Sequence, residues 1–319
     1  MVGKLIQCEF LDIDHFREKL SGWDTPAIQI EPGQIRIQLR SLKLGGVVFS
    51  DIRVNRRVID HSRPEPGWLK CVVNFSPAIF CGIEVGAGHL TLMAPGREYR
   101  SILDGNWYSI EIAVSSSVLV EHGLEAPPHL LAGPEHASIP LPVELVDMFR
   151  RLTETAFGNG RNFSVDHSSL RQGLLRALDK AFWAASIGKS PIIRRRRVEG
   201  YELTRRMIRY VESRFGQRVT VSDVAHELGI TPRALHLAVR STLDMSPLDL
   251  VLSFRLNQVR NELWYARLSE PSVTAAALAQ DFGHLGRFSQ QYRTFFGELP
   301  SETLRRTRLL DKSNSPVPS

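Results

Sequence analysis

The chain has 319 residues, which is long enough for two domains with separate hydrophobic cores. Its composition, 43% hydrophobic and 23% charged, is ordinary for a globular protein, and it lacks the run of about 18 apolar residues that predicts a membrane span. The net charge of +6 is uneven: residues from Arg194 onward hold 20 Lys and Arg against 13 Asp and Glu, whereas residues 1–193 hold 20 against 21. A basic segment joined to a near-neutral one indicates a nucleic-acid-binding domain beside a domain with another function.

The N-terminus and the cysteines indicate the compartment. Met1–Leu20 mixes charged and apolar residues and lacks the apolar centre of a signal peptide. The three cysteines, Cys8, Cys71 and Cys81, are an odd number without metal-ligand spacing. We therefore expect a cytoplasmic protein with free thiols, no metal and no membrane association.

Residues 25–115 are predicted to form many short strands. Ile35–Leu39 alternates apolar and polar residues, and further short apolar runs follow, separated by pairs such as Pro66-Gly67 and Pro95-Gly96. Many short strands at such spacing are typical of a barrel or a sandwich. We assign residues 1–140 to this β domain.

A cluster of basic residues in this domain is a candidate effector site. Arg53, Arg56 and Arg57 lie in a predicted loop between strands, and guanidinium groups bind phosphates through paired hydrogen bonds and stack on purines. The Arg-x-x-x-Arg spacing of Arg53 and Arg57 resembles the arginine motif of PilZ domains, which bind cyclic di-GMP. The alternative is a solvated surface loop.

PilZ domains pair that motif with a downstream Asp/Asn-x-Ser-x-x-Gly. This chain has Asn74 and Ser76 in the corresponding order, with Ile79 in place of the Gly, and Trp68 is a candidate stacking platform. The resemblance implies cyclic di-GMP, or a related cyclic dinucleotide, as the effector. A small aromatic or sugar effector in the domain interior is the competing hypothesis, and regulation by a partner protein without any ligand is the third.

Residues 141–193 are predicted to be a helical connector. Apolar residues recur at three- and four-residue steps in two stretches, which predicts two amphipathic helices. These helices are expected to pack on each other, on the β domain, or on a second subunit as a dimerisation region. Ser190-Pro191 ends the second helix, and the Arg194–Arg197 run then either contacts DNA phosphates or forms a solvated linker.

Residues 194–310 contain one short pattern twice. The first copy starts with an apolar stripe from Val221 to Leu228, turns at Gly229, and restarts at Thr231-Pro232, where Thr caps a helix and Pro suits its first position. This is a helix-turn-helix layout, whose second helix enters the major groove of DNA. The residues expected on the outer face of that second helix are Arg233, His236, Leu237 and Arg240.

The second copy runs from Val273 through Asp281-Phe282-Gly283 into a helix with inward Phe288, Tyr292 and Phe295. A helix from about residue 247 to residue 266 is expected to join the two units. The outer-face residues of the second unit are Gly286, Arg287, Gln290 and Arg293. Arg and Gln suit bidentate contacts with guanine and adenine edges.

Residues 207–308 closely resemble the AraC/XylS family of bacterial transcription regulators. The resemblance rests on Met245-Ser246-Pro247, Phe254-Arg255-Leu256 and the run from Phe295 to Glu302. It implies that the two recognition helices lie in successive turns of the major groove. Leu237 and Gln290 stand where the family often has Arg, which changes the bases that would be read.

The same resemblance implies a cupin-like β-barrel that senses an effector for the N-terminal domain, residues 1–140. Leu90–Tyr99 is similar to that domain's strand and Pro-Gly turn, although Tyr99 stands where a metal-binding His often follows. The rival classes are a cupin enzyme with a DNA-docking domain and an architectural DNA binder without sequence preference.

We therefore expect an α+β protein with an N-terminal cupin-like β-barrel, a helical connector, an all-α double helix-turn-helix domain, and a disordered tail at 311–319. Its expected function is a non-enzymatic, sequence-specific transcription activator controlled by an effector, and it needs no cofactor. The expected partners are double-stranded DNA, RNA polymerase and a second copy of the chain. Coupling between the effector and DNA need be only a few kcal/mol to regulate binding.

Overall fold

The computed structural model describes residues 5–19, 27–133, 137–158, 166–187, 198–214, 216–265 and 272–314. It divides into an N-terminal unit, Met1–Ala27 with Arg36–Arg197, and a C-terminal unit, Ile28–Ile35 with Val198–Ser319. The last crossing between the units lies at 197/198, whereas the boundary expected from the sequence was 193/194. The Arg194–Arg197 run lies outside the described residues.

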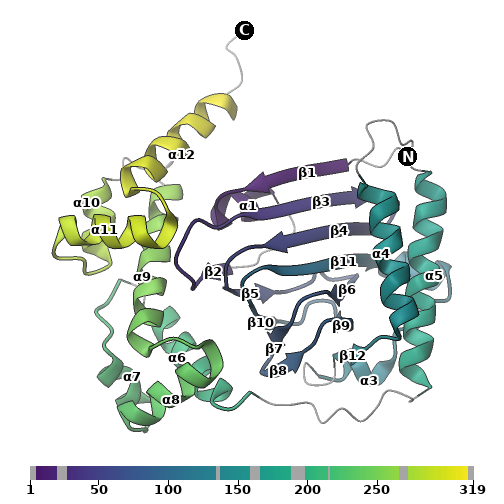
Figure 1. Ribbon diagram of the computed structural model, residues 1–319, viewed down its shortest axis with the longest axis horizontal. Helices are drawn as coiled ribbons and strands as arrows, with labels where there is room; N and C mark the ends of the chain where they lie inside the picture. Colours follow the sequence, from purple (N-terminus) through teal and green to yellow (C-terminus); the bar gives the residue numbers. More distant parts are fainter. Residues whose placement is uncertain are drawn as a thin grey trace. The chain divides into compact units, whose positions relative to one another are not determined.

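The strands form two antiparallel sheets (Figure 1). The seven-stranded sheet has the order β1 (Leu5–Phe10), β3 (Ile37–Lys43), β4 (Val47–Val54), β11 (Trp107–Ser115), β6 (Trp68–Asn74), β9 (His89–Met93), β12 (Ser138–Pro140). The five-stranded sheet has the order β2 (Ala27–Gln29), β5 (Val58–Ser62), β10 (Tyr99–Leu103), β7 (Ala78–Phe80), β8 (Ile83–Val85).

The expected closed cupin-like barrel is wrong, because these sheets stay separate within the part of the chain that the structure describes. The chain repeatedly crosses from one sheet to the other at short corners, such as residues 55–57 between β4 and β5. Asn106 takes a φ of 60° at the corner between β10 and β11. At each corner the chain ends a strand of one sheet and begins a strand of the other. The two sheets therefore face each other across a space, and no hydrogen-bonded strand pair closes them into a barrel.

Three short helices, α1 (Ile13–Lys19), α2 (Ser116–Glu121) and α3 (Pro128–Leu131), accompany the sheets. Two longer helices, α4 (Val143–Phe157) and α5 (His167–Ser186), pack on each other and on the outer face of the seven-stranded sheet. Phe49 of β4 stacks on Phe157 of α4 with ring centroids 5.3 Å apart. The connector helices thus pack on each other and on the β domain, which are two of the three surfaces expected for them.

The C-terminal unit is helical, with α6 (Tyr201–Ser213), α7 (Val221–Glu227), α8 (Pro232–Leu243), α9 (Pro247–Trp264), α10 (Val273–Ala279), α11 (Leu285–Phe296) and α12 (Pro300–Asn314). Helix α9 ends two residues before the expected position. Helix α12 continues into the expected tail as far as Asn314, and residues 315–319 lie outside the described residues. None of the described helices is long and apolar enough to cross a membrane.

A segment from early in the chain, Ile28–Ile35, belongs to this helical unit. The side-chain amide of Gln29, which is 1% exposed, donates to the carbonyls of Glu31 and Gly33 at 2.7 Å and of Phe295 at 3.2 Å. The amide of Asn257 on α9 donates to the Gln29 carbonyl at 2.8 Å. The segment is therefore held against α9 and the C-terminal end of α11 by buried hydrogen bonds.

Candidate nucleic-acid interface and interior cavity

The first helix-turn-helix unit comprises α7 and α8, and both helices begin with a side-chain cap. Thr220 and Asp223 form a reciprocal capping box at α7, in which the Thr220 hydroxyl accepts from the Asp223 amide at 3.1 Å. Hydrogen bonds from Thr220 lower the pKa of the Asp223 carboxyl. Thr231 caps α8 by accepting from the Ala234 amide at 3.2 Å, and Pro232 follows as expected.

The second unit, α10 and α11, repeats the same turn with a different residue at its centre. The residue after the left-handed position donates to a carbonyl five residues earlier in both units: Ile230 to Ala225 and Phe282 to Ala277, each at 3.0 Å. Gly229 has a φ of 67° in the first turn. Asp281 has a φ of 60° in the second, a conformation that Asp tolerates better than most side chains.

The outer face of α8 carries the predicted DNA-contacting residues. Arg233, His236, Leu237 and Arg240 are exposed, and Leu237 is 58% exposed. The residues expected to face inward are buried: Leu235, Ala238, Val239 and Thr242. An exposed leucine on a basic helix face is suited to a contact with a thymine methyl group.

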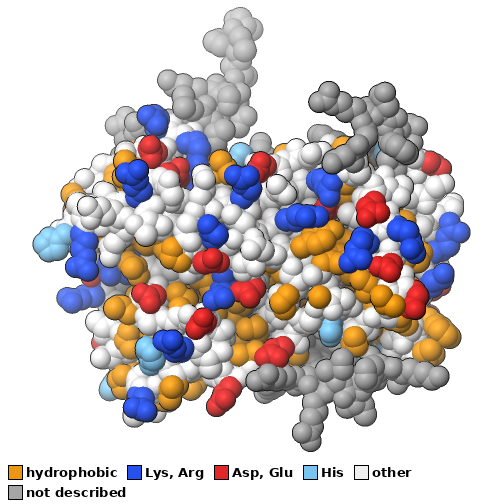
Figure 2. Space-filling model, viewed as in Figure 1, with side chains coloured by type: hydrophobic (Ala, Val, Ile, Leu, Met, Phe, Trp, Pro, Cys, Tyr) orange, Lys and Arg blue, Asp and Glu red, His pale blue; other side chains and the backbone are white. Residues whose placement is uncertain are grey.

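The outer face of α11 has the same organisation. Gly286, Arg287, Gln290 and Arg293 are exposed, whereas Phe288, Tyr292 and Phe295 are buried as expected. Basic side chains and a histidine stand out at the edge of this unit over α10 and α11 (Figure 2). Both second helices thus present an uncovered face, although their contact with DNA stays a prediction.

Arg255 of α9 holds the second turn in place. Its Nε donates to the Gln280 carbonyl at 2.7 Å, its Nη2 lies 3.7 Å from Asp281 Oδ2, and its guanidinium lies 4.4 Å from the centroid of the Phe282 ring. These contacts fix the turn that sets the direction of α11. The sequence marked Phe254-Arg255-Leu256 as part of the resemblance but did not assign this role.

A buried charge cluster joins α9, α11 and α12. Glu298 Oε1 lies 3.1 Å from Arg260 Nη2 and 3.0 Å from Arg306 Nη2, and it accepts from the Thr303 hydroxyl at 2.7 Å. The Arg260 side chain is 4% exposed and lies 4.5 Å from the centroid of the Phe296 ring. Sequence reasoning missed this cluster, because no spacing along the chain links position 260 to position 298.

The basic residues of the predicted effector loop contact other groups of the N-terminal unit, and Arg53 lies within β4, not in a loop as expected. Arg57 Nη2 pairs with Asp104 Oδ1 at 2.7 Å. The guanidinium of Arg53, whose side chain is 52% exposed, lies 4.2 Å from the centroid of the Tyr108 ring. Arg56 Nη1 donates to the carbonyl of the preceding residue at 3.1 Å.

The residues predicted to complete that site lie apart from Arg53. Asn74 is buried, donates to the Thr91 hydroxyl at 3.2 Å, and lines the space between the sheets together with Trp68. On β4, Ser50, Ile52 and Val54 line that space, so Arg53 points to the opposite face of the sheet. Ser76 lies at a corner, where its hydroxyl donates to the Asn106 carbonyl at 3.2 Å. The structure therefore does not bring Arg53 and Asn74 together.

The space between the two sheets is a cavity of about 640 Å³ within the N-terminal unit. This volume is typical of small-molecule sites. Much of its wall is apolar and includes Val58, Val72, Phe80, Met93 and Trp107.

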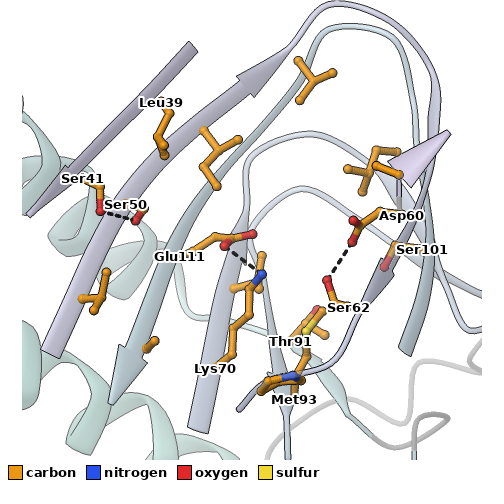
Figure 3. A pocket seen from close by; sticks show the side chains of 18 of the residues that line it. Leu39, Ser41, Ser50, Asp60, Ser62, Lys70, Thr91, Met93, Ser101 and Glu111 are labelled. Carbon is orange, nitrogen blue, oxygen red and sulfur yellow. Dashed lines mark hydrogen bonds and ion pairs between the residues drawn. The ribbon is translucent and has the colours of Figure 1, made fainter. Parts of the chain in front are cut away.

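Charged side chains project into the cavity from both sheets (Figure 3). Lys70 of β6 pairs with Glu111 of β11 at 2.8 Å, with side-chain exposures of 5% and 14%. Asp60 of β5 accepts a hydrogen bond from the Ser62 hydroxyl at 2.7 Å. Burial raises the pKa of the Asp60 carboxyl, although the charge of Lys70 opposes this shift.

No group of three or more His, Cys, Asp and Glu side chains is placed to hold a metal ion among the residues that the structure describes. His89, the histidine nearest the cupin-like turn in sequence, contacts the carbonyl of Ala87, and burial lowers its pKa.

Two helix-turn-helix units on one helical scaffold define a double helix-turn-helix protein of the DNA-binding class. A family model described as a helix-turn-helix domain matches residues 224–306. XylDLEGF operon transcriptional activator 2 of Pseudomonas putida is 30% identical over 132 residues, which cover 41% of this chain and 84% of that protein. The chain therefore belongs to the AraC/XylS family of helix-turn-helix transcription regulators.

Other relatives match a similar length of the chain. XylDLEGF operon transcriptional activator 3 of Pseudomonas putida is 34% identical over 127 residues, 38% of this chain and 37% of that protein. The chain thus spans little more than a third of the length of that relative. A crystal structure of a probable AraC family transcriptional regulator from Rhodopseudomonas palustris CGA009 is 33% identical, covers 33% of this chain and 97% of that chain, and has a TM-score of 0.32.

Proposed function

We propose that the protein is a sequence-specific transcription activator that reads two successive major-groove segments with α8 and α11, under control of an effector bound by its N-terminal unit. The observation that carries the proposal is the repeated turn, which leaves the outer face of both second helices uncovered and basic. The relatives named as activators support the direction of regulation.

Each exposed residue has a role that follows from its chemistry. Arg233 and Arg287 are the candidates for bidentate contacts with guanine, and Gln290 is the candidate for adenine. His236 and Leu237 add contacts from α8. Arg240 and Arg293, nearer the C-terminal ends, are placed to contact either bases or phosphates.

The test starts from DNA selected with the purified protein out of a random library, followed by affinity measurements on the selected site and on unrelated DNA. Arg287→Ala is expected to weaken binding to the selected site by about 1–3 kcal/mol and to affect unrelated DNA far less. Arg305→Ala, which removes an exposed arginine from α12, is the matched control. Equal losses on both DNAs would instead favour an architectural DNA binder.

The effector is proposed to occupy the cavity of the N-terminal unit. Its volume, its apolar wall and its few convergent polar groups support this assignment. The protein is also proposed to form a homodimer and to contact RNA polymerase, as the family resemblance implies. Sedimentation of the free and DNA-bound protein tests the first, and in vitro transcription with purified polymerase tests the second.

Cyclic di-GMP at Arg53, Arg56 and Arg57 is the second candidate. The exposed guanidinium of Arg53 supports it, whereas the pairing of Arg57 with Asp104 and the separation from Asn74 count against it. Calorimetric titration with cyclic di-GMP should show binding that the Arg53→Ala/Arg57→Ala variant loses. The absence of binding would mean that Arg53, Arg56 and Arg57 form no effector site, and the cavity would remain the proposed effector site.

A further inference from the structure

The charges inside the cavity are unequal. Lys70 is the one cation among the described interior-lining residues, and Glu111 pairs with it at 2.8 Å. Lys43 and Glu65 also line the cavity but are exposed and of opposite sign. Asp60 is thus a second interior carboxyl opposite a single ammonium group, and its hydrogen bond comes from the neutral Ser62 hydroxyl.

We propose that the cavity binds a small organic cation with an apolar body, and that its ammonium group pairs with Asp60. This inference rests on the proposed function, whose effector it assigns to a chemical class. A cation at Asp60 would balance the interior charge, because a buried carboxylate is stabilised by an opposite charge within hydrogen-bonding distance.

The remainder of the wall defines the rest of the ligand. Phe80, Met93 and Trp107 provide apolar contact area, and the Ser101 side chain lies on β10 beside Asp60, its cross-strand partner in register. Figure 3 shows Asp60, Ser62 and Ser101 on one side of the cavity and Lys70 and Glu111 on the other. A ligand with one cationic end for Asp60 and an aromatic or alkyl body for the apolar wall matches this arrangement of side chains.

Anionic ligands fit this cavity poorly. A ligand carboxylate would compete with Glu111 for the Lys70 ammonium group, whose charge the 2.8 Å contact with Glu111 already balances. A neutral ligand would add no charge opposite Asp60, which would then share the Lys70 ammonium group with Glu111. The ion pair therefore selects against anions, and Asp60 selects for cations.

The pKa of Asp60 supplies a second readout. Burial raises this pKa above its ordinary value, so at acidic pH more of the Asp60 population is protonated in the free protein than for an exposed aspartate. When an ammonium ion binds, the Asp60 carboxyl releases its proton to the buffer while the ligand keeps its own protons. Proton release should therefore accompany binding and increase as the pH falls toward the free-protein pKa.

The experiment is calorimetric titration of the full chain with a panel of alkyl- and arylamines led by 2-phenylethylamine, with 2-phenylethanol and 3-phenylpropanoate as the neutral and anionic counterparts. We expect the amines to bind at least about tenfold more tightly than either counterpart, and Asp60→Asn to remove that preference. Asp179→Asn, an exposed site on α5, is the matched control. Repeating the titrations in buffers of different ionisation enthalpy measures the released proton.

The inference is overturned if no amine in the panel binds, if the carboxylate binds more tightly, or if Asp60→Asn leaves the preference intact. Thermal melts establish that the variant is folded. DNA affinity is measured separately with and without saturating amine. Amine binding without any change in DNA affinity would retain the ligand class but refute effector control, whereas specific DNA binding without amine binding would refute only the ligand class.

Discussion

The hydrogen bonds of Gln29 provide a direct test of how the Ile28–Ile35 segment is held in the helical unit. Gln29→Ala removes an amide that contacts three carbonyls, two within the segment and one, Phe295, at the end of α11. The amide has two N–H groups, one of which is shared between two carbonyls, so a net contribution of about 0.5–1.5 kcal/mol for each N–H gives a local loss of roughly 1–3 kcal/mol.

Hydrogen–deuterium exchange of the peptide spanning residues 27–37 is the assay. The amide of Gly33 donates to the Phe295 carbonyl at 2.9 Å, so its protection reports whether the segment is docked. A loss of about 1–3 kcal/mol predicts exchange roughly 5- to 150-fold faster, if exchange occurs through local opening.

Two further variants separate the possible causes. Gln29→Met keeps the length of the side chain but removes its donors, so it should accelerate exchange almost as much as Gln29→Ala. Gln217→Ala changes an exposed glutamine of the same unit and should have no effect. Unchanged protection of Gly33 in Gln29→Ala would refute the reasoning, and rapid exchange in Gln29→Ala alone would assign the effect to packing.

Three other substitutions test separate parts of the structure. Glu298→Ala leaves the 4%-exposed Arg260 side chain without this carboxylate and is expected to lower the free energy of unfolding in urea by about 3–5 kcal/mol. Gly286→Ala meets open space and should stabilise α11 by about 0.5–1 kcal/mol, yet weaken binding to selected DNA if this face enters the groove; equal binding would place the face outside the interface. Asp60→Asn should raise the melting temperature at neutral pH but have little effect near pH 3.8, because a raised folded-state pKa makes the wild-type protein lose stability as the pH rises above the ordinary value of 3.8.

The helical unit was predictable because its signals are local. Thr231 and Pro232 mark the start of α8 in the sequence and in the structure, and helical spacing separated the buried Leu235 from the exposed Arg233. The conformation of Asp281 was not predictable from such local signals. Its left-handed conformation follows from the turn and its contact with Arg255, not from a residue type that requires it.

The sheets were predictable as strands but not as an arrangement. Short apolar runs separated by Gly and Pro are compatible with a closed barrel and with two sheets alike, since both bury alternate side chains. The corners decide between them. Whether the chain changes sheets at residues 55–57 depends on the pairing of β4 with β11 and of β5 with β10, which are contacts between distant parts of the sequence.

The dependence on distant contacts also explains why the sequence motif suggested a site at Arg53 and Asn74 that the structure does not form. In an antiparallel sheet, the face on which a side chain lies depends on its register. Arg53 lies opposite Tyr108, whereas Asn74 lies opposite Ser109, the next residue of the shared neighbour β11. Adjacent residues of one strand point to opposite faces, so Arg53 and Asn74 diverge although their order along the chain fits the motif. The charge pairing inside the cavity arises from the same rule: Lys70 and Asn74 share the face that lines the cavity, and it is this face that brings Lys70 to Glu111.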